Sequence, residues 1–523
     1  MKALLTGNEA IARGCYEANV WVATGYPGTP SSEVITTIST LYPEIDSEWS
    51  INEKVALEIA IGASLGGVRS IATMKHVGLN VAADALMTLS YTGVNAGLVI
   101  YVADDPGMHS SQNEQDTRNY AKFAKIPLFE PMDSNEAKNF TKIAFEISED
   151  FDTPVIVRGV TRVAHSKSIV SLEEPKRSKP EYKYKKNVAK YTMMPLYAIP
   201  KHPFIIERYK KLRTFSENFN GHIEEYNSYE TGIITHGLIY NYVKEVFPQA
   251  SIFKIGMYPI PIERLREFAS KVKKLYVIEE LDPVIEEELK ASGFNLTGKE
   301  LIPITGELLP DRIRKAFGIN TQNYYPQELP PRPPVLCKGC GHIPVFEVLK
   351  ELNVTVMGDI GCYTLGALPP YDSMDTTICM GASIGMEEGL KKVQKLSNKN
   401  TPSFAVIGDS TFFHSGLPHL LNAVYNNIPI KLIILDNRIT AMTGHQPTVS
   451  TGLNNKFQST TQIDLENLIR GFGVKRVRKV NPYKKEELKK IIQEELSINE
   501  ISVIIADEIC IIGENIIKKF KNQ

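Results

Sequence analysis

The stretch Ser403–Gln446 reads SFAVIGDSTFFHSGLPHLLNAVYNNIPIKLIILDNRITAMTGHQ. Its apolar run Phe404–Ile407 is short enough for a buried strand, and Gly408–Ser410 ends that run. Ser415–Pro418 marks the start of a helix, because proline is tolerated in a first helical turn. The run Lys431–Leu435 predicts a second strand. The stretch therefore predicts a strand–helix–strand unit with two parallel strands.

Both predicted strands end in polar residues. Gly408 and Asp409 follow the first strand, and Asp436 and Asn437 follow the second. Because parallel strands have their carboxyl ends at one edge of a sheet, we expect these residues to lie close together. Asp409 offers a carboxylate and Asn437 an amide oxygen, which are the ligands that Mg²⁺ prefers, and Gly408 lets the backbone approach a ligand. Ordinary turn residues at strand ends explain the same pattern, so the spacing alone leaves both readings open.

The two strand ends carry a resemblance to a known family. Gly408–Ser410 and Asp436-Asn437 resemble the thiamine-diphosphate motif, which is normally Gly-Asp-Gly followed later by Asn-Asn. The continuation Arg438–Gln446 is similar to the 2-oxoacid:ferredoxin oxidoreductase branch of the thiamine enzymes. The chain departs from the motif at Ser410 and Asp436, and neither departure removes a ligand that the resemblance implies.

The resemblance implies a cofactor site of thiamine diphosphate with Mg²⁺, in which Asp409, Asn437 and the backbone carbonyl of Ile439 bind the metal. Cys337–His342 (CKGCGH) is similar to a cofactor loop of the same family, and a zinc site is disfavoured there because a second ligand pair is missing. Gly358–Tyr363 looks like the companion loop that offers backbone N–H groups to phosphate. The cofactor-binding residues implied in this way are Cys340, Gly341, His342, Gly361, Cys362, Tyr363, Met380, Gly381, Gly408, Asp409, Ser410, Asn437 and Ile439.

Composition narrows the class of protein. The chain has 523 residues, enough for about three domains, with 43% hydrophobic and 23% charged residues, as in soluble globular proteins. A net charge of −1 gives no indication of a nucleic-acid or membrane surface. The amino terminus lacks a signal-peptide pattern, no apolar stretch reaches the length of a membrane span, and six cysteines do not make a disulfide scaffold. We therefore expect a cytoplasmic protein that binds neither nucleic acid nor membrane.

The chain reads as α/β throughout its predicted domains. Gly97–Ala103 and Pro154–Val157 are short apolar strands, as in a parallel sheet that is covered on both faces. With the domain types that the resemblance implies, two thiamine-diphosphate-binding-type domains flank a smaller one. The predicted segments are a pyrimidine-binding-type α/β domain (1–165), a lysine-rich connector (166–229), a transketolase-C-like α/β domain (230–320), a proline-rich linker (321–334) and a diphosphate-binding α/β domain (335–523).

The loop Gly25–Glu33 (GYPGTPSSE) contains glycines and prolines that fix a tight turn, and a turn alone explains the string. It also looks like the Tyr-Pro-x-Thr-Pro-Ser-Ser segment of the 2-oxoacid:ferredoxin oxidoreductases. By this resemblance Thr29 contacts the substrate carboxyl or carbonyl group, and Gly28 leaves room for a larger substrate.

Three further residues are candidates in the first domain. Glu53 begins a helix, where an acid complements the helix dipole, and by resemblance it is the glutamate that shares a proton with N1′ of the aminopyrimidine. His76 is either a proton donor near the substrate or a structural histidine. Arg118 is either a bidentate ligand of the substrate carboxylate or a surface arginine.

Taken together, the motifs follow the order found in the α subunit of indolepyruvate:ferredoxin oxidoreductases. The resemblance implies a 2-oxoacid and CoA as substrates, a smaller β subunit, and a heterodimer or heterotetramer. That family typically ends with a ferredoxin-like segment that binds iron–sulfur clusters, but this chain has no C-x₂-C-x₂-C-x₃-C run. We therefore expect no iron–sulfur cluster in this chain, and transfer of electrons to ferredoxin or a separate iron–sulfur protein.

The predicted reaction is the oxidative decarboxylation of a 2-oxoacid, such as the aryl pyruvate indolepyruvate, to its acyl-CoA. One alternative is a non-oxidative thiamine-dependent decarboxylase that releases an aldehyde, which the missing cluster motif favours. Another is a non-catalytic α/β scaffold, which the presence of Glu53, Asp409 and Asn437 disfavours.

Overall fold

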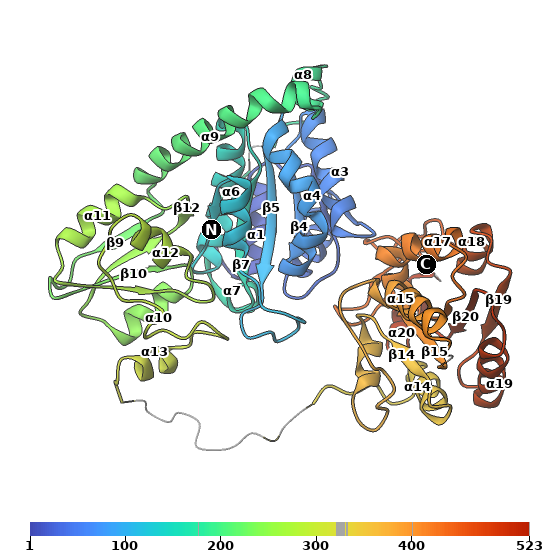
Figure 1. The fold of residues 1–523 in the computed structure, drawn as a ribbon. Helices are drawn as coiled ribbons and strands as arrows, with labels where there is room; N and C mark the ends of the chain where they lie inside the picture. The colour runs from blue at the N-terminus through green and yellow to red at the C-terminus, as the bar shows by residue number, and fades with distance from the viewer. Residues whose placement is uncertain (176, 321–329, 331–332, 400, 522–523) are drawn as a thin grey trace. The chain divides into compact units, whose positions relative to one another are not determined.

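The computed structural model describes residues 1–175, 177–320, 330, 333–399 and 401–521. The chain forms two compact units, Met1–Gln327 and Glu328–Gln523, and each contains parallel sheet with helices packed on it (Figure 1). The α/β class predicted from the sequence is therefore confirmed. The predicted linker, 321–334, lies largely outside the described residues, and the other domain boundaries remain predictions. None of the helices described here is both long and apolar enough to cross a membrane.

A seven-stranded sheet forms the centre of the first unit, and all its strands are parallel except the short edge strand β12. Polar loops that follow its central strands emerge at one edge, where α/β proteins bind ligands. In spatial order the strands are β12 (Met257–Tyr258), β6 (Leu128–Phe129), β7 (Val155–Val160), β5 (Leu98–Asp104), β4 (Ser70–Lys75), β2 (Val22–Gly25) and β3 (Asp46–Trp49).

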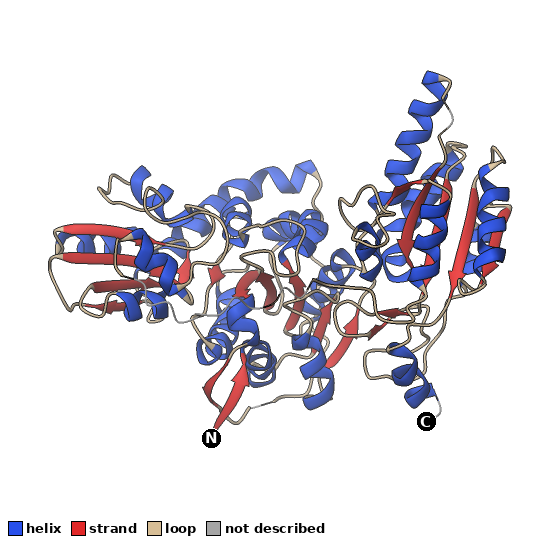
Figure 2. Cartoon of the chain, turned by 90° about the horizontal axis from the view of Figure 1, so that it is seen from below, coloured by secondary structure: helices blue, strands red, loops and turns tan. Residues whose placement is uncertain are grey.

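Helices cover both faces of this sheet (Figure 2). Strands β4, β5 and β7 are buried along their whole length, which explains why the sequence shows apolar runs instead of alternation. The helices are α1 (Gly7–Glu17), α2 (Glu33–Leu41), α3 (Glu53–Gly66), α4 (His76–Thr92), α5 (Thr117–Ala124), α6 (Ser134–Asp150) and α7 (Thr161–His165).

A second sheet of four strands completes the first unit, with the edge strand β9 antiparallel to the others. Its three parallel strands lie within the segment 230–320, which the sequence analysis read as α/β. The order is β13 (Lys274–Ile278), β10 (Thr231–His236), β11 (Ser251–Ile255) and β9 (Ile223–Glu225), with helices α10 (Ile239–Val246), α11 (Ile262–Ser270), α12 (Val284–Ala291) and α13 (Pro310–Ala316).

The predicted connector, 166–229, contains more regular structure than its lysine-rich sequence suggests. Strand β8 (Lys167–Ser171) pairs with β1 (Lys2–Thr6), and the short helix α8 (Val188–Tyr191) precedes the 23-residue helix α9 (Pro195–Glu217). α9 packs on α4 of the larger sheet and on α11 of the smaller one (Figure 1). The segment therefore lies along both sheets, and its end supplies β9 to the second sheet.

A five-stranded parallel sheet forms the core of the second unit. Its strands are, in spatial order, β14 (Thr355–Met357), β15 (Ser403–Gly408), β16 (Lys431–Asp436), β20 (Ser502–Asp507) and β19 (Arg476–Val480). The longer helices are α14 (His342–Glu351), α15 (Ala382–Ser397), α17 (Leu417–Tyr425), α18 (Leu465–Gly471), α19 (Lys485–Leu496) and α20 (Gly513–Lys521).

Strand β15 illustrates why the opening stretch folds as it does. Phe404 and Val406 pack into one hydrophobic cluster, and Ala405 and Ile407 pack into another. Successive side chains of a strand point to opposite faces, so a strand that is covered on both sides is apolar throughout. β15 and β16 are adjacent and parallel, as the sequence predicts.

The helix after β15 begins earlier than predicted. We expected a loop up to Ser415, but helical structure begins directly after the strand, with α16 (Asp409–Thr411) and a turn of π-helix (Phe412–Gly416) leading into α17. Pro418 lies in the first turn of α17, where it is tolerated. Pro418 therefore marks the change from the π-helical turn to α17. Asp409 is the first residue of the helical segment.

Candidate active site

The carboxyl edge of the second unit brings the predicted metal ligands together. Asp409 follows β15 and Asn437 follows β16, and the two strands pair side by side up to Gly408 and Leu435. Ile439 lies just beyond, in the short strand β17 (Ile439–Thr440), which pairs with β18 (Gln446–Pro447). The Asn437 side-chain oxygen accepts a hydrogen bond from the Ile439 backbone N–H at 3.2 Å, which folds this loop back toward the strand end.

The Asp409 carboxyl group is buried and carries hydrogen bonds that the sequence did not indicate. The hydroxyl groups of Ser450 and, at 3.4 Å, Thr448 donate to its Oδ2 atom. Ser410, next to it, hydrogen-bonds through its hydroxyl to the Thr440 hydroxyl at 2.9 Å. The loop 448–450 lies some forty residues away in the chain, so no local pattern could have connected it with Asp409.

Two carboxyl groups at this edge, those of Asp409 and Asp436, have raised pKa values. Burial, and next the charge of Asp436, raise the pKa of Asp409 to about 7. Burial, and next the charge of Asp507, raise the pKa of Asp436 to about 6. The Oδ1 atom of Asp436 is buried and has no hydrogen-bond partner among the described residues. Arg438 and Lys479 compensate part of this charge, and the buried oxygen donors that remain are of the kind that Mg²⁺ prefers.

The glycine before Asp409 meets a side chain of the protein itself. A Cβ atom on Gly408 would lie 2.6 Å from the ring of Tyr363, and the same ring lies over Gly361. In the structure Gly408 allows close approach of Tyr363, and the predicted approach of a ligand to its backbone stays a prediction. The Tyr363 hydroxyl donates to the Ile360 carbonyl at 2.8 Å, which fixes the ring across both glycines.

Asp359 ties two of the predicted cofactor loops together, a role that the sequence analysis missed. Its buried carboxylate accepts hydrogen bonds from the backbone N–H groups of Ile360 (2.9 Å), Gly381 (2.8 Å) and Ser383 (3.0 Å). The last two lie at the amino-terminal end of α15, directly after Met380. An acidic residue beside a glycine at a strand end is the signal that could have identified it.

Four cysteines from three parts of the chain lie near one another. Burial raises the pKa of Cys340 to about 11 and that of Cys362 to about 12, and the neighbouring thiols of Cys337 and Cys510 add to both effects. All four are free thiols. Within the described ranges, no three His, Cys, Asp or Glu side chains are arranged to hold a metal ion. Sequence spacing could not show that Cys510 lies close to the other three.

The remaining residues of the CKGCGH loop begin a helix. Gly341 is the residue before α14, and His342 is the first residue of that helix. Burial lowers the pKa of His342 to about 4, so its ring is neutral at neutral pH. The ring meets that of Tyr363 edge to face, with 6.1 Å between centroids. This contact joins the CKGCGH loop to the loop that contains Cys362.

The carboxyl edge of the first unit's larger sheet collects the other candidates. Asn52 caps α3, accepting from the Val55 N–H at 2.9 Å, and Glu53 is the first residue of that helix with only 5% of its surface exposed. A Cβ atom on Gly78 would lie 2.5 Å from the Glu53 Oε1 atom. Gly78 therefore makes room for the Glu53 carboxyl group, which the sequence analysis did not recognise.

Two serine hydroxyl groups of the Gly25–Glu33 loop hydrogen-bond to the backbone of the same loop. Ser32 accepts from the Gly28 N–H at 2.9 Å, and Ser31 donates to the Gly28 carbonyl at 2.7 Å. Thr29 is partly exposed, and its carbonyl accepts from the Ser110 hydroxyl at 3.3 Å. The loop after β2 and the loop after β5 thus meet at Thr29.

His76 is buried, and its two ring nitrogens lie in different surroundings. Its Nε2 atom lies 3.2 Å from the Asn113 carbonyl, which can only accept, so Nε2 carries the hydrogen. Burial lowers the pKa of the ring, which keeps it neutral. The Nδ1 atom is then an acceptor, buried without a partner among the described residues. The predicted role as a proton donor near the substrate stays a prediction.

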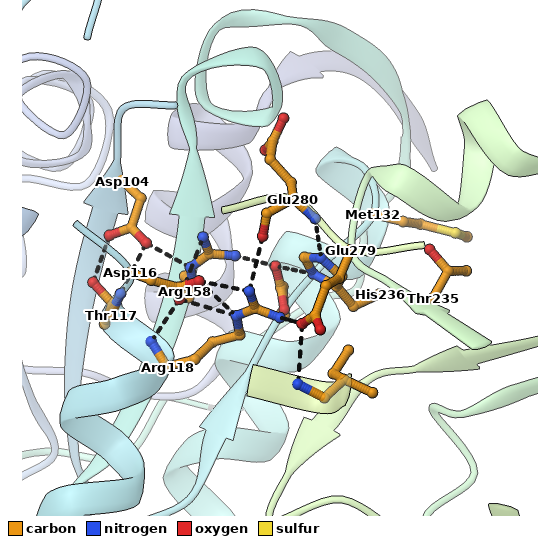
Figure 3. A network of polar contacts seen from close by, with 12 residues as sticks. Asp104, Asp116, Thr117, Arg118, Met132, Arg158, Thr235, His236, Glu279 and Glu280 are labelled. Atoms are coloured by element: carbon orange, nitrogen blue, oxygen red, sulfur yellow. Dashed lines mark hydrogen bonds and ion pairs between the residues drawn. The ribbon is translucent and has the colours of Figure 1, made fainter. Parts of the chain in front are cut away.

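Arg118 lies inside a buried network of polar contacts (Figure 3). Only 1% of its surface is exposed, and its guanidinium group is bound by Asp116, by Glu279 at 2.8 Å and by the Glu280 carbonyl at 2.8 Å. A buried guanidinium must have its donors satisfied inside the protein, and here the protein satisfies them. The predicted substrate-binding role of Arg118 is wrong for this physical reason.

Two family profiles match this chain, one in each unit. The family profile described as "Thiamine pyrophosphate enzyme, C-terminal TPP binding domain" matches residues 359–506. The profile described as "Pyruvate flavodoxin/ferredoxin oxidoreductase, thiamine diP-bdg" matches residues 13–235. The first range contains the Asp409 edge, and the second contains Thr29, Glu53 and His76.

Curated relatives match along almost the whole chain. Indolepyruvate oxidoreductase subunit IorA of Archaeoglobus fulgidus is 41% identical, covering 98% of this chain and 87% of the relative. The subunits of the same name from Pyrococcus horikoshii and Methanothermobacter thermautotrophicus are 40% and 37% identical, covering 97% and 99% of this chain and 86% and 88% of the relatives. Among solved structures, a 2-oxoglutarate:ferredoxin oxidoreductase from Magnetococcus marinus shares the fold, with a TM-score of 0.50 and 16% identity over 61% of this chain and 65% of that one.

Proposed function

The chain belongs to the thiamine-diphosphate-dependent indolepyruvate oxidoreductase family, and on that premise we propose that it catalyses the oxidative decarboxylation of a 2-oxoacid. The substrate class is aryl pyruvates such as indolepyruvate. The acid, CoA and oxidised ferredoxin give the acyl-CoA, CO₂ and reduced ferredoxin, with two electrons leaving one at a time. Bound thiamine diphosphate supplies the carbanion and the electron sink for this chemistry.

The carboxyl edge of the second unit carries the proposal most directly. Asp409 and Asp436 are buried, their pKa values are raised, and one Asp436 oxygen lacks a partner among the described residues. A site of this kind is incomplete without a cation. We assign Mg²⁺ to the oxygens of Asp409 and Asn437 and to the Ile439 carbonyl, in line with the preference of that ion for oxygen ligands.

The residues of the first unit act on protons and on the substrate. Glu53 holds a proton at N1′ of the aminopyrimidine, for which its buried position beside Gly78 is suited. Thr29 contacts the carboxyl or carbonyl group of the substrate. The Nδ1 atom of His76 is available as a hydrogen-bond acceptor in the same group of loops.

Further chains complete the reaction. The relatives are named as subunits, which supports a partner subunit for this chain. We propose a smaller β subunit, a heterodimer or heterotetramer, and ferredoxin or a separate iron–sulfur protein as electron acceptor. A cytoplasmic location stays a prediction.

Product analysis tests this function against its alternatives. The purified chain, alone and with the partner subunit, is supplied with thiamine diphosphate, Mg²⁺, indolepyruvate, CoA and an electron acceptor. Indoleacetyl-CoA formed only with partner and acceptor supports the oxidoreductase. Indoleacetaldehyde from the chain alone would indicate a non-oxidative decarboxylase, and no binding of thiamine diphosphate with Mg²⁺ would indicate a scaffold.

The cysteine group bears on the electron path. Our expectation that this chain holds no iron–sulfur cluster stays a prediction. The thiols of Cys337, Cys340, Cys362 and Cys510 influence one another electrostatically, but among the described residues they are not arranged to hold a metal ion. Iron and acid-labile sulfide are measured in the chain purified without oxygen and in its Cys510→Ser variant. Iron and sulfide that are lost in the variant would indicate a cluster, and their absence from the wild type would support our expectation.

A further inference from the structure

Lys75 is a buried lysine within the group of loops that contains Thr29 and Glu53. It is the last residue of β4 and immediately precedes α4, and only 9% of its surface is exposed. Its aliphatic chain lies against the Thr29 loop, because a Cβ atom on Gly28 would be 3.3 Å from the Lys75 Cγ and 3.4 Å from its Cδ. The ammonium group is therefore held at the carboxyl edge of the sheet.

The charge of Lys75 is not matched by an ion pair. Its Nζ atom donates one hydrogen bond, to the Ser110 carbonyl at 2.8 Å, and forms no ion pair with any residue that the structure describes. The nearby carboxylate of Asp105 is bound by other donors, namely Ser110, Ser111 and Thr161. An ammonium group has three N–H donors, so two remain for a ligand.

The helix that Lys75 precedes is also open to an anion. α4 has 17 residues, and no side chain caps its amino-terminal end. Unpaired N–H groups and the helix dipole at such an end favour a negative group. The Nδ1 atom of His76 in the same turn is a buried acceptor without a partner among the described residues, so it leaves the anion to the Lys75 ammonium group and the helix N–H groups.

Ser110 joins these features to the predicted substrate contact. Its carbonyl accepts from Lys75, and its hydroxyl donates to the Thr29 carbonyl at 3.3 Å. The cation and the threonine that faces the substrate thus share one loop residue. We propose that the Lys75 ammonium group, with the first turn of α4, binds the carboxylate of the 2-oxoacid substrate. This inference rests on the proposed function and fills the role that Arg118 cannot fill.

Substitution of Lys75 tests the assignment through the Michaelis constant. In Lys75→Met, the KM for indolepyruvate should rise about 10- to 100-fold, the loss expected for one charge-assisted hydrogen bond. The KM for CoA, the affinity for thiamine diphosphate with Mg²⁺ and the rate of C2–H exchange should not change. Lys75→Arg keeps the charge and should stay within a few fold of the wild type. The matched control is Lys54→Met, which removes a partly exposed lysine from the neighbouring helix α3 and should change none of these values.

A pH profile gives a second readout that a purely structural lysine would not affect. The charged and titratable groups that face the ammonium are Asp105, Glu53 and His76. Burial, opposed by the charges of Asp105 and Glu53, lowers the pKa of Lys75 to about 8. The kcat/KM of the wild type for indolepyruvate should therefore fall above about pH 8, when the ammonium loses its proton. The kcat/KM of the Lys75→Arg variant should not fall in this pH range, because arginine keeps its proton. The kcat of the wild type at saturating substrate should depend less on pH than its kcat/KM.

The outcomes separate the inference from the function it rests on. If the wild type with its partner forms no acyl-CoA, the proposed function is wrong. If the wild type is active and Lys75→Met binds the cofactor but keeps its KM for indolepyruvate, the inference is overturned. A rise in the KM for CoA instead would assign the cation to a CoA phosphate and would also overturn it. If Lys75→Met does not fold, the pH profiles decide. A fall of kcat/KM above about pH 8 in both the wild type and Lys75→Arg would contradict the assignment of Lys75.

Discussion

Asp409 and Asp436 dominate the electrostatics of the second unit's carboxyl edge. With pKa values raised to about 7 and about 6, they bind more protons in the folded chain than in the unfolded chain, where an aspartate titrates near 4. Without metal, the folded state therefore loses stability as the pH rises from about 4 through about 7. The Mg²⁺ that we propose for this site would offset this loss by replacing the protons.

Proton release on cofactor binding measures this coupling. Titration of preformed Mg²⁺–thiamine diphosphate into the apo chain should release about one proton at pH 6.5 and close to none at pH 8.5. Calorimetry in two buffers of different ionisation enthalpy gives the count. The Asp436→Asn variant should release fewer protons at pH 6.5, and Asp409→Ala should lose Mg²⁺-dependent binding. Equal proton counts at both pH values would contradict the assignment.

Glu53 provides a prediction about the chemistry itself. The Glu53→Gln variant keeps the size of the side chain beside Gly78, so cofactor binding should be retained. Because the amide cannot share a proton with N1′, the rate of C2–H exchange should fall at least about 100-fold. Exchange of bound thiamine diphosphate followed by NMR measures the rate. A normal rate in this variant would remove Glu53 from the proposed mechanism.

The loops of the second unit are held by contacts between elements. Gly408 ends β15, Gly361 precedes the 3₁₀ turn Cys362–Ala367, and the Tyr363 ring lies across both. Asp359, just after β14, receives three backbone N–H groups, two of them from the start of α15. Gly381, which precedes that helix, has φ +88°, a left-handed conformation that favours glycine. A few residues thus connect the ends of β14 and β15 with α15.

Removal of the Asp359 carboxylate should loosen this connection. Three buried N–H groups would lose their acceptor, so Asp359→Ala should lower the free energy of unfolding by about 1–3 kcal/mol. Affinity for the cofactor should fall as well, because the loops with Cys362 and Gly381 would no longer be held together. Asp464→Ala is the matched control, since Asp464 is an exposed cap of α18 with a single hydrogen bond to Asn467 at 2.8 Å. Urea unfolding and calorimetry compare the two, and equal effects would contradict the role of Asp359.

Across the first unit, a buried ionic network joins the larger sheet to the smaller one (Figure 3). Arg158 on β7 pairs with Asp104 and Glu130, while His236 on β10 hydrogen-bonds to Glu130 at 2.7 Å. Arg118 connects the loop before α5 to Glu279, which follows β13. Breaking one partner of such a network leaves a charge buried without compensation, which is costly.

The role of Arg118 in this network can be tested directly. Arg118→Met should lower the free energy of unfolding by about 3–5 kcal/mol, because Asp116 and Glu279 lose their cation. Arg314→Met removes a partly exposed arginine with two carboxylate partners and should cost about 1 kcal/mol or less. Urea unfolding measures both. Unchanged stability of Arg118→Met with a raised KM for the 2-oxoacid would instead restore a substrate-binding role.

Local sequence was sufficient for the elements and for part of the site. Apolar runs with polar ends predicted β15 and β16, since a strand that is covered on both faces is mostly apolar between its ends. The same argument placed Asp409 and Asn437 at one edge, because parallel neighbours end together. Glu53 at a helix start was found for the same kind of local reason.

The sequence by itself thus determined the α/β class, the strands and the edges at which polar residues meet, because each depends on periodicity within a few residues. Tertiary structure alone decided which polar groups are buried and what they contact. It placed Arg118 inside an ionic network, brought Ser450 to Asp409, and left Lys75 with an unmatched charge beside Thr29. Burial and partnership depend on segments far apart in the chain, and these two properties govern the charge of a side chain and its freedom to bind a ligand.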